Sequence, residues 1–219
     1  IKDDQGNVYG FGSNFKGQLG MGNYEDIYVP TKIDNLPENN IKEIATWGDQ
    51  NLSCTFDGEV YIWPCVKEGH KISIPQCINF ASDKIKISNV SCGYNFGILL
   101  STHGLAFSFG KYNNDGQLGH GDREAKGFPA LIQSLKDAGE KIETVDCGFR
   151  HVIAKSSLGR VYTWGWGLNG QLGHGSHCSE LSPRHLNLDT RNRKNKAIQI
   201  AAGYEHSVIM LENRKILWF

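Results

Sequence analysis

Apolar and polar residues alternate along short stretches of the chain, and the clearest stretch ends at a run of glycines. Between residues 161 and 164, Tyr162 and Trp164 fall on one face, because side chains of a strand point to opposite faces in turn. Residues 165–175 are rich in glycine, which permits the positive φ angles of a tight reversal. The pattern predicts a short β-strand that runs into a structured loop.

The same pattern recurs along the chain. Gly-Gln-Leu-Gly follows the aromatic stretch in three places, and the turn glycines that precede the stretches lie 46 to 55 residues apart: Gly6, Gly58, Gly104 and Gly159. The paired aromatic residues are Tyr9 with Phe11, Tyr61 with Trp63, Phe107 with Phe109, and Tyr162 with Trp164. Self-similarity at this period is typical of a propeller or a solenoid.

Each repeat contains four predicted strands. Besides the aromatic strand there is a strand with a proline and a pair of strands around a second marker glycine, which is Gly48, Gly93, Gly148 or Gly203. A helical period is indicated only weakly, at residues 132–140. We therefore expect an all-β protein, a β-propeller of four-stranded antiparallel blades. We expect the chain to form one partial propeller that starts and ends within a blade. Its approximate blades, by repeat, are residues 1–57, 58–103, 104–158 and 159–219.

Some single residues have a predicted structural role. Leu19, Leu118 and Leu172 are lone apolar residues in polar loops, and we expect each to plug the space between adjacent sheets. His151 and His206 stand three residues after the marker glycine, where we expect them to bond the backbone of a neighbouring strand rather than to act in acid–base chemistry.

The second repeat differs from the others. Trp63 and Pro75 are 12 residues apart, whereas Trp164 and Pro183 are 19 apart, because residues 64–71 replace the glycine-rich loop. A changed loop alters one face of the molecule, so it is a candidate contact surface, with neutral loss of a loop as the alternative.

Composition and charge remove several functions. Lysine plus arginine equal aspartate plus glutamate at 23 each, so the basic footprint of a nucleic-acid-binding chain is missing. No apolar run reaches the roughly 20 residues of a membrane span. The six cysteines have no disulfide spacing, and we interpret them as free thiols in a reducing compartment.

Two apparent motifs, one for a dinucleotide and one for zinc, are not supported by a closer comparison of the residues. Residues 165–170 fit the dinucleotide pattern Gly-x-Gly-x-x-Gly, but the equivalent loops break it and no helix can follow. His174, His177, Cys178 and His185 suggest zinc, yet they lack a paired structural spacing. We expect no catalytic residues, no cofactor and no metal.

The motifs Val-Tyr-x-Trp-Gly, Gly-Gln-Leu-Gly-x-Gly and Cys-Gly-x-x-His resemble the repeats of the regulator of chromosome condensation family. The resemblance covers nearly the whole chain and implies a seven-bladed propeller, of which about four blades are present. It further implies that more blades, or another chain, cover the open faces. Members of the family include an exchange factor for the Ran GTPase that binds the nucleosome, interaction modules of large ubiquitin ligases and ciliary proteins, and a plant ultraviolet photoreceptor.

These functions can be weighed against this sequence. The photoreceptor motif Gly-Trp-Arg-His-Thr corresponds to residues 148–152, where Phe149 replaces the tryptophan, which argues against light sensing. The short repeats leave little room for the β-wedge of the Ran exchange factor. A nucleosome would bind the basic cluster Arg191, Arg193, Lys194 and Lys196, whose alternative interpretation is a solvated loop.

We therefore predict a non-enzymatic protein-interaction module, with guanine-nucleotide exchange for a Ran-like GTPase or chromatin binding as alternatives. The expected compartment is cytoplasmic or cytoskeletal and ciliary, with the nucleus as the alternative. The candidate partner surface comprises Asn14, Lys16, Lys67, His70, Asn113, Asn114, Trp166, Asn169, Arg191, Arg193 and Lys194.

Overall fold

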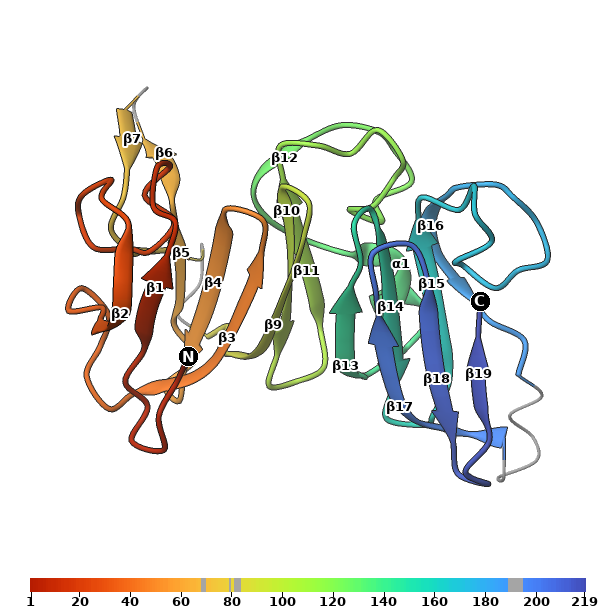
Figure 1. The fold of residues 1–219 in the computed structure, drawn as a ribbon. Coiled ribbons are helices and arrows are strands. Elements are labelled where there is room, and N and C mark those ends of the chain that lie inside the picture. The colour runs from red at the N-terminus through yellow and green to blue at the C-terminus, as the bar shows by residue number, and fades with distance from the viewer. Residues whose placement is uncertain (68–69, 79, 81–83, 189–194) are drawn as a thin grey trace. The chain divides into compact units, whose positions relative to one another are not determined.

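The computed structural model describes residues 1–67, 70–78, 80, 84–188 and 195–219, with the backbone alone at 65–67 and 70–71 (Figure 1). By its internal contacts the chain divides into two compact units, Ile1–Val90 and Ser91–Phe219, which we describe separately. Strands dominate both units, and the described residues contain one short helix, α1 (Gln133–Asp137), within the segment where the sequence indicated one. The all-β prediction is confirmed.

The first unit contains three antiparallel sheets within its described residues. One sheet has four strands in chain order, and the other two are strand pairs. The four-stranded sheet is β3 (Ile41–Trp47), β4 (Gln50–Thr55), β5 (Val60–Trp63) and β8 (Gln76–Cys77); the pairs are β1 (Tyr9–Gly12) with β2 (Ile27–Lys32), and β6 (Cys65–Lys67) with β7 (His70–Ile72).

The second unit repeats this arrangement in three further sheets of the described chain, each antiparallel and in chain order. The first sheet is β9 (Ile87–Gly93), in which the boundary between the units falls, with β10 (Phe96–Ser101), β11 (Ala106–Gly110) and β12 (Lys126–Leu131). The second is β13 (Ile142–Cys147), β14 (His151–Ser156), β15 (Val161–Gly165) and β16 (Glu180–His185). The third is β17 (Ala197–Ala202), β18 (Ser207–Leu211) and β19 (Ile216–Trp218).

The sheets do not follow the expected blade limits of residues 1–57, 58–103, 104–158 and 159–219. Those limits were placed at the turn glycines, but Gly58, Gly104 and Gly159 each lie between the second and third strands of one sheet. The reason is local. The two strands beside a tight turn pair with each other, so the turn is the centre of a hairpin and not a boundary between sheets.

Neighbouring sheets of the second unit pack through a contact between a loop and a ring. Trp164 of β15 is fully buried, and its Nε1 donates a hydrogen bond to the Gln117 carbonyl in the loop after β11, at 3.0 Å. A Cβ atom at Gly119 of that loop would lie 2.9 Å from Trp164 Nε1, so only glycine fits without movement. Leu118 beside it is also fully buried, in one cluster with Trp164 and Val152 of the next sheet, as its predicted role requires. Leu19 and Leu172 are buried in the equivalent loops.

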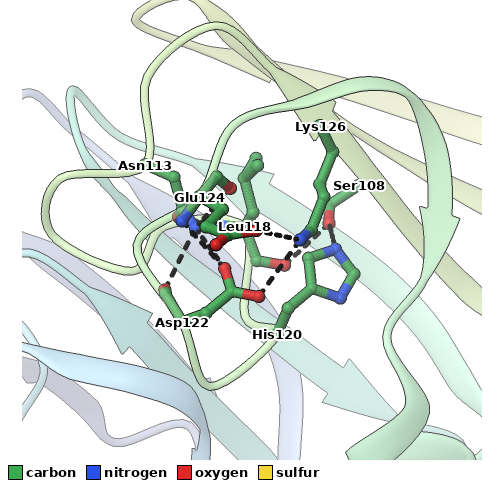
Figure 2. A network of polar contacts seen from close by, with 7 residues as sticks. All are labelled: Ser108, Asn113, Leu118, His120, Asp122, Glu124 and Lys126. Atoms are coloured by element: carbon green, nitrogen blue, oxygen red, sulfur yellow. Dashed lines mark hydrogen bonds and ion pairs between the residues drawn. The ribbon is translucent and has the colours of Figure 1, made fainter.

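The loop between β11 and β12 is held in shape by its own side chains (Figure 2). The Asn113 amide nitrogen donates to the Asp122 carbonyl at 3.1 Å and to the Glu124 carbonyl at 3.0 Å, while its oxygen accepts from the Leu118 amide at 2.9 Å. The Lys126 ammonium pairs with Asp122 at 3.1 Å. A buried amide with partners on both ends fixes the loop, and thereby presents Leu118 to the next sheet.

His151 of β14 is buried at the contact between two sheets of the second unit. Its Nε2 lies 3.0 Å from Ser207 Oγ on β18, and that hydroxyl donates to the Gln171 carbonyl at 2.9 Å. The hydroxyl therefore accepts a hydrogen bond from His151. Burial lowers the pKa of His151 to about 4, because a charged ring would lose its hydration there.

The lowered pKa of His151 predicts that the free energy of unfolding depends on pH. The unfolded chain binds a proton on His151 near pH 6.5 and the folded chain only near pH 4, so stability is full above pH 6.5 and declines as pH falls toward 4. The slope from one proton reaches about 1.4 kcal/mol per pH unit. Urea unfolding at pH 7.5 and pH 5 should show this loss in the wild type and a smaller loss in His151→Asn, since Asn51 holds the equivalent position in the first repeat. An equal loss in His151→Asn would contradict the assignment, and His103→Asn, in an exposed turn, is the control.

Candidate functional site

Three aromatic residues occupy equivalent turns of the second unit, each directly after a marker glycine. Tyr94 lies between β9 and β10, Phe149 between β13 and β14, and Tyr204 between β17 and β18. The ring centroids of Tyr94 and Phe149 are 5.0 Å apart, and those of Phe149 and Tyr204 are 4.4 Å apart with an interplanar angle of 13°. Backbone hydrogen bonds join the same residues, from the Tyr94 amide to the Phe149 carbonyl at 2.9 Å and from the Phe149 amide to the Tyr204 carbonyl at 3.1 Å.

Two more rings join this group from the glycine-rich loops. Tyr112 follows β11 and stacks on Tyr94 at 5.9 Å, while Trp166 follows β15 and meets Phe149 edge-on at 6.3 Å. We call these five residues, Tyr94, Tyr112, Phe149, Trp166 and Tyr204, the aromatic row. The three tyrosine side chains are 40%, 47% and 52% exposed in chain order, so the row is a surface and not a core.

The marker glycines explain why the turns lie so close together. A Cβ atom at Gly93 would lie 2.6 Å from the Gly148 carbonyl, and one at Gly148 would lie 2.5 Å from the Gly203 carbonyl. Real Cβ atoms do not approach a carbonyl so closely, so any other residue would push neighbouring turns apart. The recurrence of glycine in the sequence therefore sets the spacing of the rings that follow it.

Charged groups accompany the row. The Arg150 guanidinium lies 4.8 Å from the centre of the Phe149 ring, and its Nη1 is 3.4 Å from Asp115 Oδ2. At the other end, Asn169 Nδ2 donates to Glu205 Oε2 at 2.9 Å. Loop and turn of neighbouring repeats are thus linked by polar pairs at the rim of the row.

The structure places the predicted partner-surface residues in different environments. Trp166 belongs to the aromatic row, and Lys16, Asn114 and Asn169 are exposed on the loops. Asn14 and Asn113 were wrong as surface residues: they are 0% and 1% exposed, because their amides are used to close the loops. Five predicted residues have no described side chain, since the first two are traced only as backbone and the other three lie outside the described residues: Lys67, His70, Arg191, Arg193 and Lys194.

The replaced loop of the second repeat forms a hairpin. β6 and β7, which lie between β5 and β8 in the sequence, pair with each other as a separate two-stranded sheet, with Cys65 opposite Ile72. Each of its strands has three residues, and the expectation that the repeats leave little room for a protruding β-wedge stays a prediction.

The sequence analysis does not select the three tyrosines of the row. For Tyr94 and Tyr204 the available signal is the residue after each marker glycine, which is aromatic in three repeats and Asp49 in the first. Tyr112 lies in a glycine-rich loop and does not share this signal. Whether a ring at the end of a strand faces solvent depends on how close the next turn lies, and this is a tertiary property.

The pair formed by Ser108 and His120 is structural. Ser108 Oγ is 2.8 Å from His120 Nε2 (Figure 2), but it donates its proton to the Leu118 carbonyl at 2.7 Å. Burial lowers the pKa of His120. The hydroxyl is therefore an acceptor for the ring and is not activated as a nucleophile.

The described residues contain neither a metal-binding cluster nor a membrane-spanning helix. No group of three or more histidine, cysteine, aspartate or glutamate side chains among the described residues could hold a metal ion. Within the same residues, no helix has the length and apolarity needed to cross a membrane.

Comparison with known proteins identifies the class. The family model of the regulator of chromosome condensation (RCC1) repeat matches residues 5–51, 103–154 and 159–210, and a second model of that repeat matches residues 87–117 and 142–171. These matches cover more than half of the chain. The four-stranded antiparallel sheets are blades of a β-propeller, and the protein belongs to the regulator of chromosome condensation repeat family.

The relatives differ in what they do. The ultraviolet-B receptor UVR8 of Arabidopsis thaliana is 30% identical over 97% of this chain and 48% of its own length. The E3 ubiquitin-protein ligase HERC2 of Homo sapiens is 32% identical over 90% of this chain, which is 4% of that ligase. The chain therefore spans about half of UVR8 and a small part of HERC2.

Solved structures share the fold. Human WBSCR16 superposes with a TM-score of 0.82 at 24% identity, over 96% of this chain and 55% of that protein. Prp20p of Saccharomyces cerevisiae, which binds Gsp1p and histones, superposes with a TM-score of 0.77 at 21% identity, over 95% of this chain and 52% of Prp20p. At these identities the likeness shows the propeller fold alone.

Proposed function

We propose that this protein is a non-enzymatic interaction module that binds a protein partner through the aromatic row. The observation that carries the proposal is a series of five aromatic side chains, each in contact with at least one other, of which three are 40% or more exposed. Tyrosine and tryptophan dominate the energetics of protein interfaces, because they bury a large area with few rotatable bonds and keep a polar group.

The supporting arrangement of the row is pre-organised. Three of its rings, Tyr94, Phe149 and Tyr204, stand on turns that are joined by backbone hydrogen bonds, so little conformational entropy is lost when a partner covers them. The relatives include a receptor and a ligase, and a shared propeller does not choose between such functions. The exposed surface is therefore better support for the proposal than the fold is.

The compartment is part of the proposal. Cys54 and Cys147 are free and buried, and burial raises the pKa of the Cys54 thiol to about 12. Thiols kept in this form suit a reducing compartment, which supports a cytoplasmic or cytoskeletal and ciliary location.

Substitution of the row tests the interaction. Proteins captured from a cell extract should be purified and titrated against the wild type, Tyr94→Ala/Tyr204→Ala and Tyr28→Ala. We expect the double substitution to weaken binding at least tenfold, because two exposed rings of the interface are lost. Tyr28 is 90% exposed on β2 and lies outside the row, so Tyr28→Ala should bind as the wild type does. Unchanged binding by the double variant, with circular dichroism matching the wild type, would refute the proposal.

A second candidate function is guanine-nucleotide exchange on a Ran-like GTPase. The observation that favours it is the β6–β7 hairpin, which replaces a loop at one repeat alone of those described. Nucleotide release from such a GTPase should accelerate with the full-length protein and return to the spontaneous rate when residues 65–72 are replaced by a glycine–serine loop. Release at the spontaneous rate with the unmodified protein would exclude this function.

A further inference from the structure

Two repeats combine a ring, a cation and a carboxylate on their loops. In the second unit, Arg150 lies over Phe149 and pairs with Asp115. In the first unit, the Lys16 ammonium lies 5.2 Å from the centre of the Phe15 ring and pairs with Asp49. In both cases the cation is held by the negative face of an aromatic ring and by an anionic group.

The repeat that contains Tyr204 has the ring and the carboxylate, but its charges are arranged differently. Glu205 stands where Arg150 stands in the preceding repeat, and Asn169 stands where Asp115 stands. Glu205 is exposed, and Asn169 donates to one of its oxygens at 2.9 Å. An amide donor orients this carboxylate without neutralising its charge, so Glu205 can still pair with a cation.

We propose that a partner supplies this cation: an arginine or lysine side chain of a basic peptide segment lies over Tyr204 and pairs with Glu205. The inference rests on the proposed function, because it concerns one end of the aromatic row. Arginine fits better than lysine, since its planar guanidinium stacks on a ring and binds a carboxylate with two donors. The neighbouring arrangement of Arg150, Phe149 and Asp115 is the internal example of this geometry.

The negative charge of Glu205 also argues against phosphate-rich, acidic and wholly apolar partners. A phosphate-rich partner would bring negative charge to the Glu205 carboxylate, and the chain has no net positive charge to compensate. An acidic peptide would meet the same repulsion. A wholly apolar peptide would cover Tyr204 but would leave Glu205 without a partner and partly desolvated.

The probe is a fluorescein-labelled peptide in which three arginines alternate with glycine, and its binding is followed by fluorescence anisotropy. The same peptide with lysine and with glutamate in place of arginine completes the set. The protein variants are Glu205→Gln, which removes the charge at constant size, and Tyr204→Leu, which removes the π face. Glu212→Gln is the matched control, because Glu212 is an exposed carboxylate in the turn between β18 and β19.

We expect the arginine peptide to bind best, the lysine peptide more weakly and the glutamate peptide not at all. Glu205→Gln and Tyr204→Leu should each weaken arginine-peptide binding about three- to tenfold. Glu212→Gln should leave it unchanged. Binding should weaken between 50 and 200 mM salt in the wild type and less so in Glu205→Gln.

The inference is overturned if Glu205→Gln binds the arginine peptide as the wild type does, or if the glutamate peptide binds equally well. The outcome is separable from that of the proposed function. If a captured partner depends on Tyr94 and Tyr204 while the arginine peptide does not bind, the interaction surface stands and the basic partner is wrong. If the peptide binds through Glu205 while captured partners do not depend on the two tyrosines, the proposed function fails and the cation site stands.

Discussion

The contact between a loop glycine and the aromatic ring of the next sheet is the constraint on which the rest of this structure depends. At Gly119 the missing side chain lets Trp164 approach until its indole nitrogen bonds the Gln117 carbonyl. Gly20 with Trp63, and Gly173 with Phe219, repeat the contact. A four-stranded sheet cannot cover both of its apolar faces by itself, so this contact supplies what each sheet lacks.

The position of the candidate site follows from this packing. Once neighbouring sheets are fixed by the ring and the loop, their turns approach until backbone hydrogen bonds join Tyr94, Phe149 and Tyr204. The rings of these residues then stand side by side at the surface, with Tyr112 and Trp166 added from the loops. The same repeat therefore produces the core and an ordered, partly exposed surface that suits a partner.

The repeating pattern was sufficient to predict the strands, the four-stranded sheets and the buried leucines, because these depend on local alternation and on the period of the chain. It was not sufficient to separate Asn113 from Asn114. The two are neighbours of identical type, and only the path of the loop decides that Asn113 is buried and Asn114 exposed. Tyr204 was missed for a related reason: its exposure depends on the approach of neighbouring turns. The predicted blade boundaries at the turn glycines do not coincide with the boundaries of the sheets, because the two strands that flank each turn pair with each other and belong to one sheet.

The most direct test compares the free energy of unfolding of Gly119→Ala with that of Gly170→Ala. Both glycines have a positive φ, +77° and +83°, so both substitutions carry the same backbone strain. A Cβ at Gly170 would meet nothing within 4 Å, whereas one at Gly119 would meet Trp164. The account predicts that Gly119→Ala is less stable than Gly170→Ala by about 1–3 kcal/mol in urea unfolding, the cost of overpacking a fixed contact. Equal stability of the two variants would contradict it.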